Sequence, residues 1–182
     1  MKFLLVGDLH EQETTPRSRA DDFQASKNAK IEEILHLKKQ LGVDHILQTG
    51  DFFDTVKYDN NFLMKQFLLW CQANSMAGTE LSKENLSLIE AYKSYPSMIG
   101  VLGNHEMPGG NFNKEMHKQT PYHLFEKIGI PLMQFVTKEN PIIFTTEDGL
   151  KIAITGTNYH LDIDKPGPVS YTHLTLPTIT AV

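Results

Sequence analysis

Acidic, imidazole and amide side chains follow three short apolar stretches of this sequence. The stretches lead into GDLH at residues 7–10, GDFFD at residues 50–54 and GNHE at residues 103–106. Carboxylate, imidazole and amide donors form a mixed ligand set that suits Mn²⁺, Fe or Zn²⁺ better than a thiolate site would. Cys71 is the only cysteine, which excludes an internal disulfide and a cysteine-cluster metal site. The residue types therefore predict a site that binds divalent metal ions.

Each polar cluster is expected at the carboxyl end of a parallel strand. The apolar runs at residues 2–6, 43–50 and 98–102 read as buried strands, and we expect residues 2–6 to form a central strand covered on both faces. The intervals between the clusters are long enough for a strand-helix-strand unit, which needs about 30 residues or more. Open α/β sheets build their sites beyond the carboxyl ends of such strands. The three clusters are therefore expected to converge at one edge of a sheet.

Asp51, in the middle cluster, is expected to bridge two cations. A carboxylate has two oxygens and can join cations about 4 Å apart, as two-metal phosphoryl-transfer sites require. Glycine precedes Asp8, Asp51 and Asn104, and we expect it to let the chain turn sharply off each strand. Singly, such motifs are common in solvated turns. Their order, and their position after three apolar runs, favour one shared site over three unrelated loops.

Helices and further strands are predicted around these motifs. Helical patterns occur at residues 27–41, 61–76, 82–92 and 121–128, and strand patterns at residues 131–136, 141–146 and 150–155. The aromatic side chains of Phe62, Phe67 and Trp70 have helical spacing and are most simply explained as core. Strands that alternate with helices and are followed by a strand-rich part predict a layered α/β fold.

Composition limits the classes of partner. The chain has 182 residues, 40% of them hydrophobic, and a formal net charge of -5. This charge gives no overall attraction to nucleic acid or to an anionic membrane, so a phosphate-bearing substrate must be drawn by local charge such as a bound cation. The start of the chain is too short and too soon acidic for a signal peptide, and no apolar stretch reaches the ~20 residues of a membrane span. We expect a cytoplasmic protein with no membrane partner.

The last residues differ in composition from the rest of the chain. Residues 169–182, VSYTHLTLPTITAV, contain four threonines and no charged side chain. They resemble translated sequencing-adapter read-through at the end of a truncated reading frame. We therefore predict that residues 1–168 form the N-terminal portion of one domain and that residues 169–182 are a non-native tail.

The three motifs together resemble the signature of the calcineurin-like metallophosphoesterases, which runs DxH, GDxxD and GNHE or GNHD. The resemblance covers about residues 1–160. It implies a layered α/β/β/α sandwich, C-terminally incomplete here, and metal-dependent hydrolysis of phosphate esters. The stretch SRADDFQASKNAKIEEIL before VDHILQTGDFFD is similar to Mre11/SbcD-like DNA repair nucleases and their phage relatives. This narrower similarity implies a DNA exonuclease or endonuclease that works with an SbcC/Rad50-like ATPase and could form a homodimer.

The resemblance also implies a role for each matching residue. Asp8 and His10 would hold the first of two divalent ions, Asp51 would bridge both, and Asn104 would bind the second. Mn²⁺ is the expected metal, with Fe or Zn²⁺ as the alternatives. His105 would lie beside the scissile phosphate, where it would stabilise developing charge or protonate the leaving oxygen. Water activated by the two ions would attack phosphorus in line.

Other residues are expected around this site. Asp54 and Glu106 would orient the histidines or the loop backbone from behind the ligands. Arg17 and Arg19 would contact a substrate phosphate, although exposed loop arginines are more often only solvated. His117 and His123 could line a substrate groove, but a surface loop is the simpler interpretation. His36 and His45 are expected to be incidental.

Part of the family pattern is missing from this chain. The family has a further histidine and then a GHxH pair, and the sequence contains neither. His160 and His173 do not match a ligand motif. We therefore expect weak metal binding and little activity from the chain as it stands. Three functions stay open: a phosphodiesterase acting on DNA, a phosphatase or small-molecule phosphodiesterase of the same superfamily, and an inactive truncated fragment.

Overall fold

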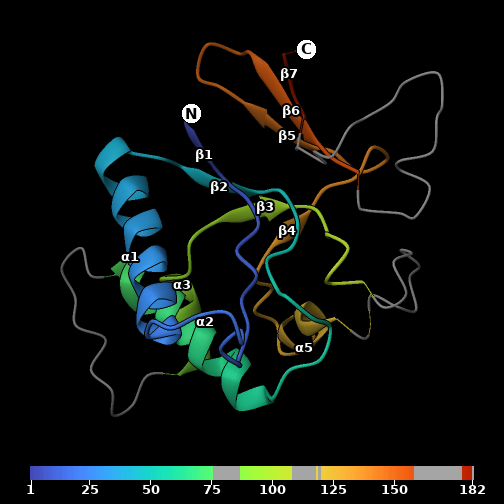
Figure 1. Ribbon diagram of the computed structural model, residues 1–182. Helices are drawn as coiled ribbons and strands as arrows, with labels where there is room; N and C mark the ends of the chain where they lie inside the picture. Colours follow the sequence, from blue (N-terminus) through green and yellow to red (C-terminus); the bar gives the residue numbers. More distant parts are fainter. Residues whose placement is uncertain (76–86, 108–117, 119, 158–177, 182) are drawn as a thin grey trace.

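The fold is described from a computed structural model that covers residues 1–75, 87–107, 118, 120–157 and 178–181. These residues form a four-stranded parallel sheet, helices and a three-stranded antiparallel sheet (Figure 1). The elements are β1 (Phe3–Val6), α1 (Phe23–Leu41), β2 (His45–Gln48), α2 (Asn60–Ser75), α3 (Leu88–Lys93), β3 (Met98–Gly100), α5 (Pro121–Lys127), β4 (Gln134–Phe135), β5 (Ile142–Thr145), β6 (Lys151–Thr155) and β7 (Thr178–Ala181).

The helices and the second sheet cover opposite faces of the parallel sheet. In Figure 1, α1, α2 and α3 lie on one side of β1–β4, and β5–β7 lie on the other. The larger apolar cluster joins Ile31 of α1 and Trp70 of α2 to Ile46 of β2. A smaller cluster joins Leu47, the next residue of β2, to Ile154 of β6. Because successive strand residues point to opposite faces, β2 contributes to both clusters. The predicted layered α/β fold is confirmed, with one helical layer and two sheets among the described residues.

The expectation that residues 2–6 form a central strand is wrong for the described sheet. The strand order is β1-β2-β3-β4, so β2 and β3 are internal and β1 lies at an edge. Leu5 of β1 is 54% exposed, whereas Leu47 of β2 and Ile99 of β3 are buried. A short apolar run is compatible with a central or an edge strand. The pattern indicates that a segment is buried, but it does not indicate which strands pair with it in the sheet.

Helix α1 begins earlier than predicted. Residues 27–41 were expected to be helical, but the helix starts at Phe23 because the Asp22 side chain accepts a hydrogen bond from the Ala25 backbone N–H at 3.1 Å. Its end matches the prediction, since Gly42 follows with φ 62, the left-handed conformation typical of a helix C-terminus.

Helix α3 begins later than predicted. Ser87 and Glu90 form a capping box, so the helix starts at Leu88 and a continuous helix over residues 82–92 is wrong; residues 82–86 themselves lie outside the described residues. The helices predicted at residues 61–76 and 121–128 are confirmed to within one residue at each end. None of the described helices is long and apolar enough to cross a membrane.

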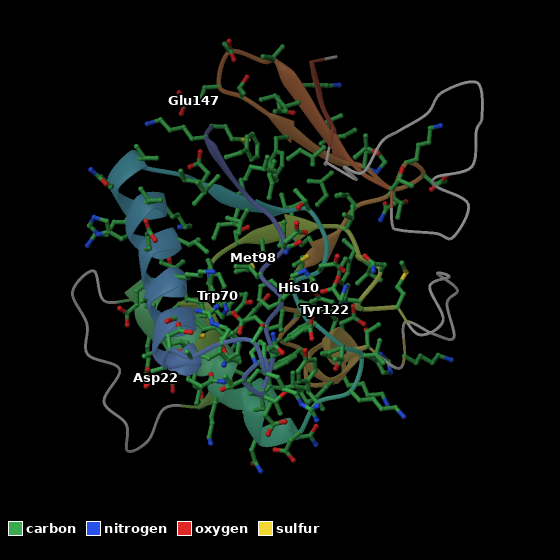
Figure 2. All side chains as sticks on the ribbon, viewed as in Figure 1. His10, Asp22, Trp70, Met98, Tyr122 and Glu147 are labelled. Carbon is green, nitrogen blue, oxygen red and sulfur yellow. The ribbon has the colours of Figure 1, made fainter. Side chains whose placement is uncertain are left out.

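The strand-rich part of the chain contributes to both sheets. Residues 131–136 contain β4, which pairs in parallel with β3. Strands β5 and β6 form an antiparallel pair, and β7 pairs with the other edge of β6. Figure 2 shows Trp70 and Met98 in the interior, and Glu147 at the far side of the molecule from Asp22. The boundary expected between residues 168 and 169 stays a prediction.

Candidate metal centre

The loops that follow β1, β2 and β3 meet beyond the carboxyl ends of these strands. Figure 2 shows His10 near the middle of the molecule, after the end of β1. The His10 backbone N–H donates to the Asp51 carbonyl oxygen at 2.9 Å. The His105 backbone N–H donates to Asp51 Oδ1, also at 2.9 Å. The loop of β2 is therefore tied to both of its neighbours, as the parallel arrangement of the three strands requires.

Donor atoms of the predicted ligands lie close enough together to share a metal ion. One donor atom from each of Asp8, His10 and Asp51 lies within 4.8 Å of the others, and the same limit joins His10, Asp54 and His105. Asn104 follows β3 in the same loop as His105 and is exposed. Carboxylate, imidazole and amide groups in one place fit Mn²⁺, Fe or Zn²⁺. The structure thus brings the loops of all four predicted metal ligands together.

The backbone of three predicted ligands is strained. Asp8, His10 and Asp51 have φ angles of 46, 46 and 54, and among the described residues no other non-glycine residue has a positive φ. A left-handed conformation at a non-glycine residue costs of order 1–3 kcal/mol and persists only where the surrounding structure enforces it. Such strain is concentrated at functional sites, so this observation supports the assignment independently of the sequence motifs.

Two of the three glycines before the ligands act differently from what was expected. Gly50 has a positive φ of 107, as a glycine turn requires. In the loop after β1, by contrast, Asp8 and His10 themselves have positive φ and Gly7 does not. Gly103 is needed for close approach, because a Cβ atom there would lie 2.1 Å from Asp51 Oδ1. A Cβ atom at Gly7 would lie 2.8 Å from Thr49 Oγ1. Two of the three glycines therefore let neighbouring loops pack closely and do not supply a left-handed turn.

Asp54 contacts both histidines of the site. Its Oδ1 lies 3.1 Å from His10 Nδ1, and its backbone carbonyl oxygen lies 3.0 Å from His105 Nδ1. A carbonyl oxygen only accepts hydrogen bonds, so Nδ1 of His105 carries the hydrogen and Nε2 is the ring nitrogen left for other contacts. The two imidazole rings meet edge to face with centroids 4.7 Å apart. The orienting role of Asp54 stays a prediction, but its contacts are those that the role needs.

Glu106 lies beneath the site and is fully buried. Its Oε1 accepts hydrogen bonds from the Phe53 backbone N–H at 3.0 Å and from the Tyr122 hydroxyl, and its Oε2 accepts from the Gly103 backbone N–H at 2.9 Å. Burial raises the pKa of Glu106 to about 7, and the three donors act in the opposite direction. The Glu106 carboxyl group thus connects three elements: the loop after β2 through Phe53, the loop after β3 through Gly103, and α5 through Tyr122.

A buried ion pair supports the loop after β1, and the sequence reading missed it. Lys27 Nζ lies 2.6 Å from Glu11 Oε2, and the two residues are 6% and 2% exposed. Lys27 also donates to the Gln12 carbonyl oxygen at 3.0 Å. Burial raises the pKa of Glu11, while Lys27 lowers it. The available signal was a lysine four residues before Ile31 on the apolar face of α1.

The structure separates the two arginines that were expected to contact substrate. Arg19 lines a groove together with Asp8 and His10, and its guanidinium forms a bidentate pair with Asp21 at 2.8 and 2.5 Å. Arg17 is exposed and is not among the residues that line this groove. His117, His160 and His173 lie outside the described residues.

The sequence was compared with known families and proteins. The family model described as calcineurin-like phosphoesterase matches residues 1–173. No curated protein matches the chain. Proteins of that family bind divalent metal ions and hydrolyse phosphate esters, which is the chemistry that the donor set and the strained loops fit.

Proposed function

This chain belongs to the calcineurin-like phosphoesterase family, and we propose that it hydrolyses phosphodiester bonds in DNA with two bound divalent ions, Mn²⁺ in the first instance. The observation that carries the proposal is the cluster of Asp8, His10 and Asp51 donors within 4.8 Å of one another on left-handed backbone. The His105 ring adjoins this cluster and contacts His10 edge to face. A structural polar loop would have no need of that strain.

The residues divide the work of the reaction between them. When bound, two divalent ions neutralise charge on the phosphate and activate water for in-line attack on phosphorus. Asp8 and His10 would hold one ion, Asp51 would face both, and Asn104 would hold the second. Nδ1 of His105 donates to the Asp54 carbonyl oxygen, so Nε2 is the atom left to face the substrate. In the imidazolium form, with a hydrogen on both ring nitrogens, the Nε2–H would donate a proton to the leaving oxygen or a hydrogen bond to the phosphate.

The choice of DNA as substrate rests on the similarity of residues 18–54 to Mre11/SbcD-like nucleases. From the same similarity we propose that the partner protein is an SbcC/Rad50-like ATPase and that the chain forms a homodimer. The donor set among the described residues is smaller than a complete two-metal shell, so we expect weak affinity and slow turnover, and assays need metal in excess.

Hydrolysis assays on four substrates test the proposal. The purified chain is incubated with MnCl2 and with bis-p-nitrophenyl phosphate, p-nitrophenyl phosphate, single-stranded DNA or double-stranded DNA. We expect cleavage of the diester and of at least one DNA substrate, and a rate lowered by about 10²–10⁴-fold in His105→Asn. The variant His36→Asn, which changes an exposed histidine of α1, is the matched control and is expected to keep the wild-type rate.

The outcomes separate the alternatives. Cleavage of the monoester alone would overturn the nuclease assignment in favour of a phosphatase. Cleavage of bis-p-nitrophenyl phosphate without any cleavage of DNA would favour a small-molecule phosphodiesterase. Absence of turnover on all four substrates, with metal binding by calorimetry also absent, would show that this chain is an inactive fragment.

A further inference from the structure

A groove lies beside the metal centre, between the loop after β1 and the first half of α1. It has a volume of about 210 Å³. The residues of its lining that matter here are Asp8, His10, Arg19, Phe23, Lys27 and Lys30. Sites that enclose a whole small molecule usually measure about 300–1,000 Å³, so this groove is suited to one part of a larger substrate.

The three basic side chains of the groove differ in their partners. Arg19 is paired with Asp21, and Lys27 is paired with the buried Glu11. Lys30 lies one turn after Lys27 on the same face of α1 and is exposed. Within the part of the chain that the structure describes, its ammonium group has no hydrogen bond or ion pair. Lys30 is therefore the cation of the groove that has charge available for an anionic ligand.

We propose that this groove binds the phosphate next to the one that is cleaved, with Lys30 as the residue that contacts it. The inference rests on the proposed function, since it places a DNA strand across Asp8 and His10. Lysine binds phosphate as a point charge and needs no fixed geometry. The chain as a whole carries a net charge of -5, so an unpaired lysine next to the centre has to supply local attraction that the rest of the surface does not.

The groove also has an apolar wall of the right kind for a sugar. Two cations lie near the Phe23 ring, with the Arg19 guanidinium carbon 5.2 Å and Lys27 Nζ 5.4 Å from its centroid. Lys27 is held by the buried Glu11 carboxylate, which fixes the Lys27 side of this wall before a ligand arrives. In this proposal Lys30 contacts the phosphate, and Phe23 offers apolar surface to the neighbouring sugar.

A binding experiment tests the role of Lys30 without relying on turnover. The background is His105→Asn, so that DNA stays intact, with MnCl2 at a fixed excess and a short fluorescein-labelled oligothymidylate as probe. Lys30→Met, Lys30→Arg and the control Lys39→Met, at the other end of α1, are compared by fluorescence anisotropy over a series of NaCl concentrations. One phosphate contact on single-stranded DNA contributes about 0.7 to the slope of log K against log salt.

We expect Lys30→Met to weaken binding by about fivefold at low salt and to lower the salt slope by about 0.7, with Lys30→Arg restoring most of both. Lys39→Met should change neither quantity. With His105 intact, Lys30→Met should hydrolyse bis-p-nitrophenyl phosphate at the wild-type rate, because that substrate has no second phosphate. A salt slope that is the same in Lys30→Met and in the His105→Asn parent would overturn the inference while leaving the phosphodiesterase standing. If the wild-type chain itself did not hydrolyse bis-p-nitrophenyl phosphate, the proposed function would be overturned instead.

Discussion

The two ends of the parallel sheet both carry a histidine with oxygen partners, yet they are built differently. At the amino end, His45 Nδ1 lies 2.8 Å from Ser97 Oγ, and Asp44 Oδ2 accepts a hydrogen bond from the Lys2 backbone N–H at 2.7 Å. The residue with a left-handed backbone there is Gly42, for which that conformation carries no steric penalty. The polar groups of this end satisfy one another at the surface.

At the carboxyl end, the polar groups are held in place by buried charge. Asp8, His10 and Asp51 adopt left-handed conformations that favour glycine. Beneath them lie the buried carboxyl groups of Glu106 and Glu11, each with its own donors. Both strain and burial of charge oppose folding, so a sequence retains them together only where the geometry is needed. A histidine close to an oxygen atom is therefore weak evidence for a functional site. Left-handed backbone at non-glycine residues, packed on buried carboxyl groups, is stronger evidence.

The largest difference between the two ends should appear in activity. Asp51→Asn keeps the shape of the side chain and removes the charge that would face two ions, so we expect hydrolysis to fall by about 10³-fold or more. Mn²⁺ affinity measured by calorimetry should fall as well. Asp44→Asn makes the same change at the amino end and should alter neither quantity. Equal loss in both variants would show that net charge, and not the position of Asp51, controls the reaction.

The next largest effect concerns the ion pair under the loop after β1. Lys27→Met leaves the buried Glu11 carboxylate without its partner, and we expect the free energy of unfolding to fall by about 3–5 kcal/mol in urea denaturation. Glu11→Met combined with Lys27→Met should recover most of this loss, because two apolar side chains then replace two charges. Arg19→Met breaks the exposed pair with Asp21 and should leave stability almost unchanged. A small effect of Lys27→Met would mean that water reaches Glu11.

A smaller effect is expected at the hydroxyl that contacts Glu106. Tyr122→Phe removes one of three donors to this carboxyl group and should lower the free energy of unfolding by about 1.5–3 kcal/mol when Glu106 is ionised. The control Tyr92→Phe removes a hydrogen bond to the Pro131 carbonyl oxygen at an exposed site and should lower it by less than about 1 kcal/mol.

The pH dependence of the Tyr122→Phe effect gives a second check. The pKa of Glu106 is raised to about 7 in the folded chain, so its protonated form is favoured and its contribution to stability is lost as the pH rises through about 7. The Tyr122 hydroxyl opposes this loss by donating to the carboxylate. The difference in unfolding free energy between Tyr122→Phe and wild type should therefore grow on the alkaline side of that pKa. A difference that is independent of pH would show that Glu106 does not titrate in this range.

The sequence predicted the parts of this structure that depend on local pattern. The three clusters follow β1, β2 and β3 because apolar runs and their glycine stops are local signals. The aromatic side chains of α2 are core, as their spacing indicated, with Phe67 and Trp70 each 1% exposed. The meeting of the clusters also followed, because the carboxyl ends of parallel strands share one edge.

The parts that the sequence did not predict depend on contacts between distant residues. Glu106 binds the backbone of Phe53 and the hydroxyl of Tyr122, and neither partner can be identified from a motif. The helical pattern begins at Lys27, but in the structure Lys27 is a buried cation within the first turns of α1. The sharp turns were expected at the glycines before the ligands, whereas Asp8, His10 and Asp51 themselves adopt the left-handed backbone. Propensity favours glycine in that conformation, and the packing that overrides propensity is tertiary.

The smallest expected effect lies at the amino end. Burial lowers the pKa of His45, and Asp44 raises it. Since the folded pKa lies below the unfolded value of about 6.5, the contribution of His45 to stability is present above that pH and is lost as the pH falls through it. Ser97→Ala removes the hydroxyl contact and should change the free energy of unfolding by less than about 0.5 kcal/mol, with hydrolysis unaffected. Urea denaturation on both sides of pH 6.5, with hydrolysis measured in parallel, checks both statements. If Ser97→Ala slowed hydrolysis as much as Asp51→Asn does, the histidine at the amino end would belong to a site as well, and backbone strain would no longer distinguish the two ends of the sheet.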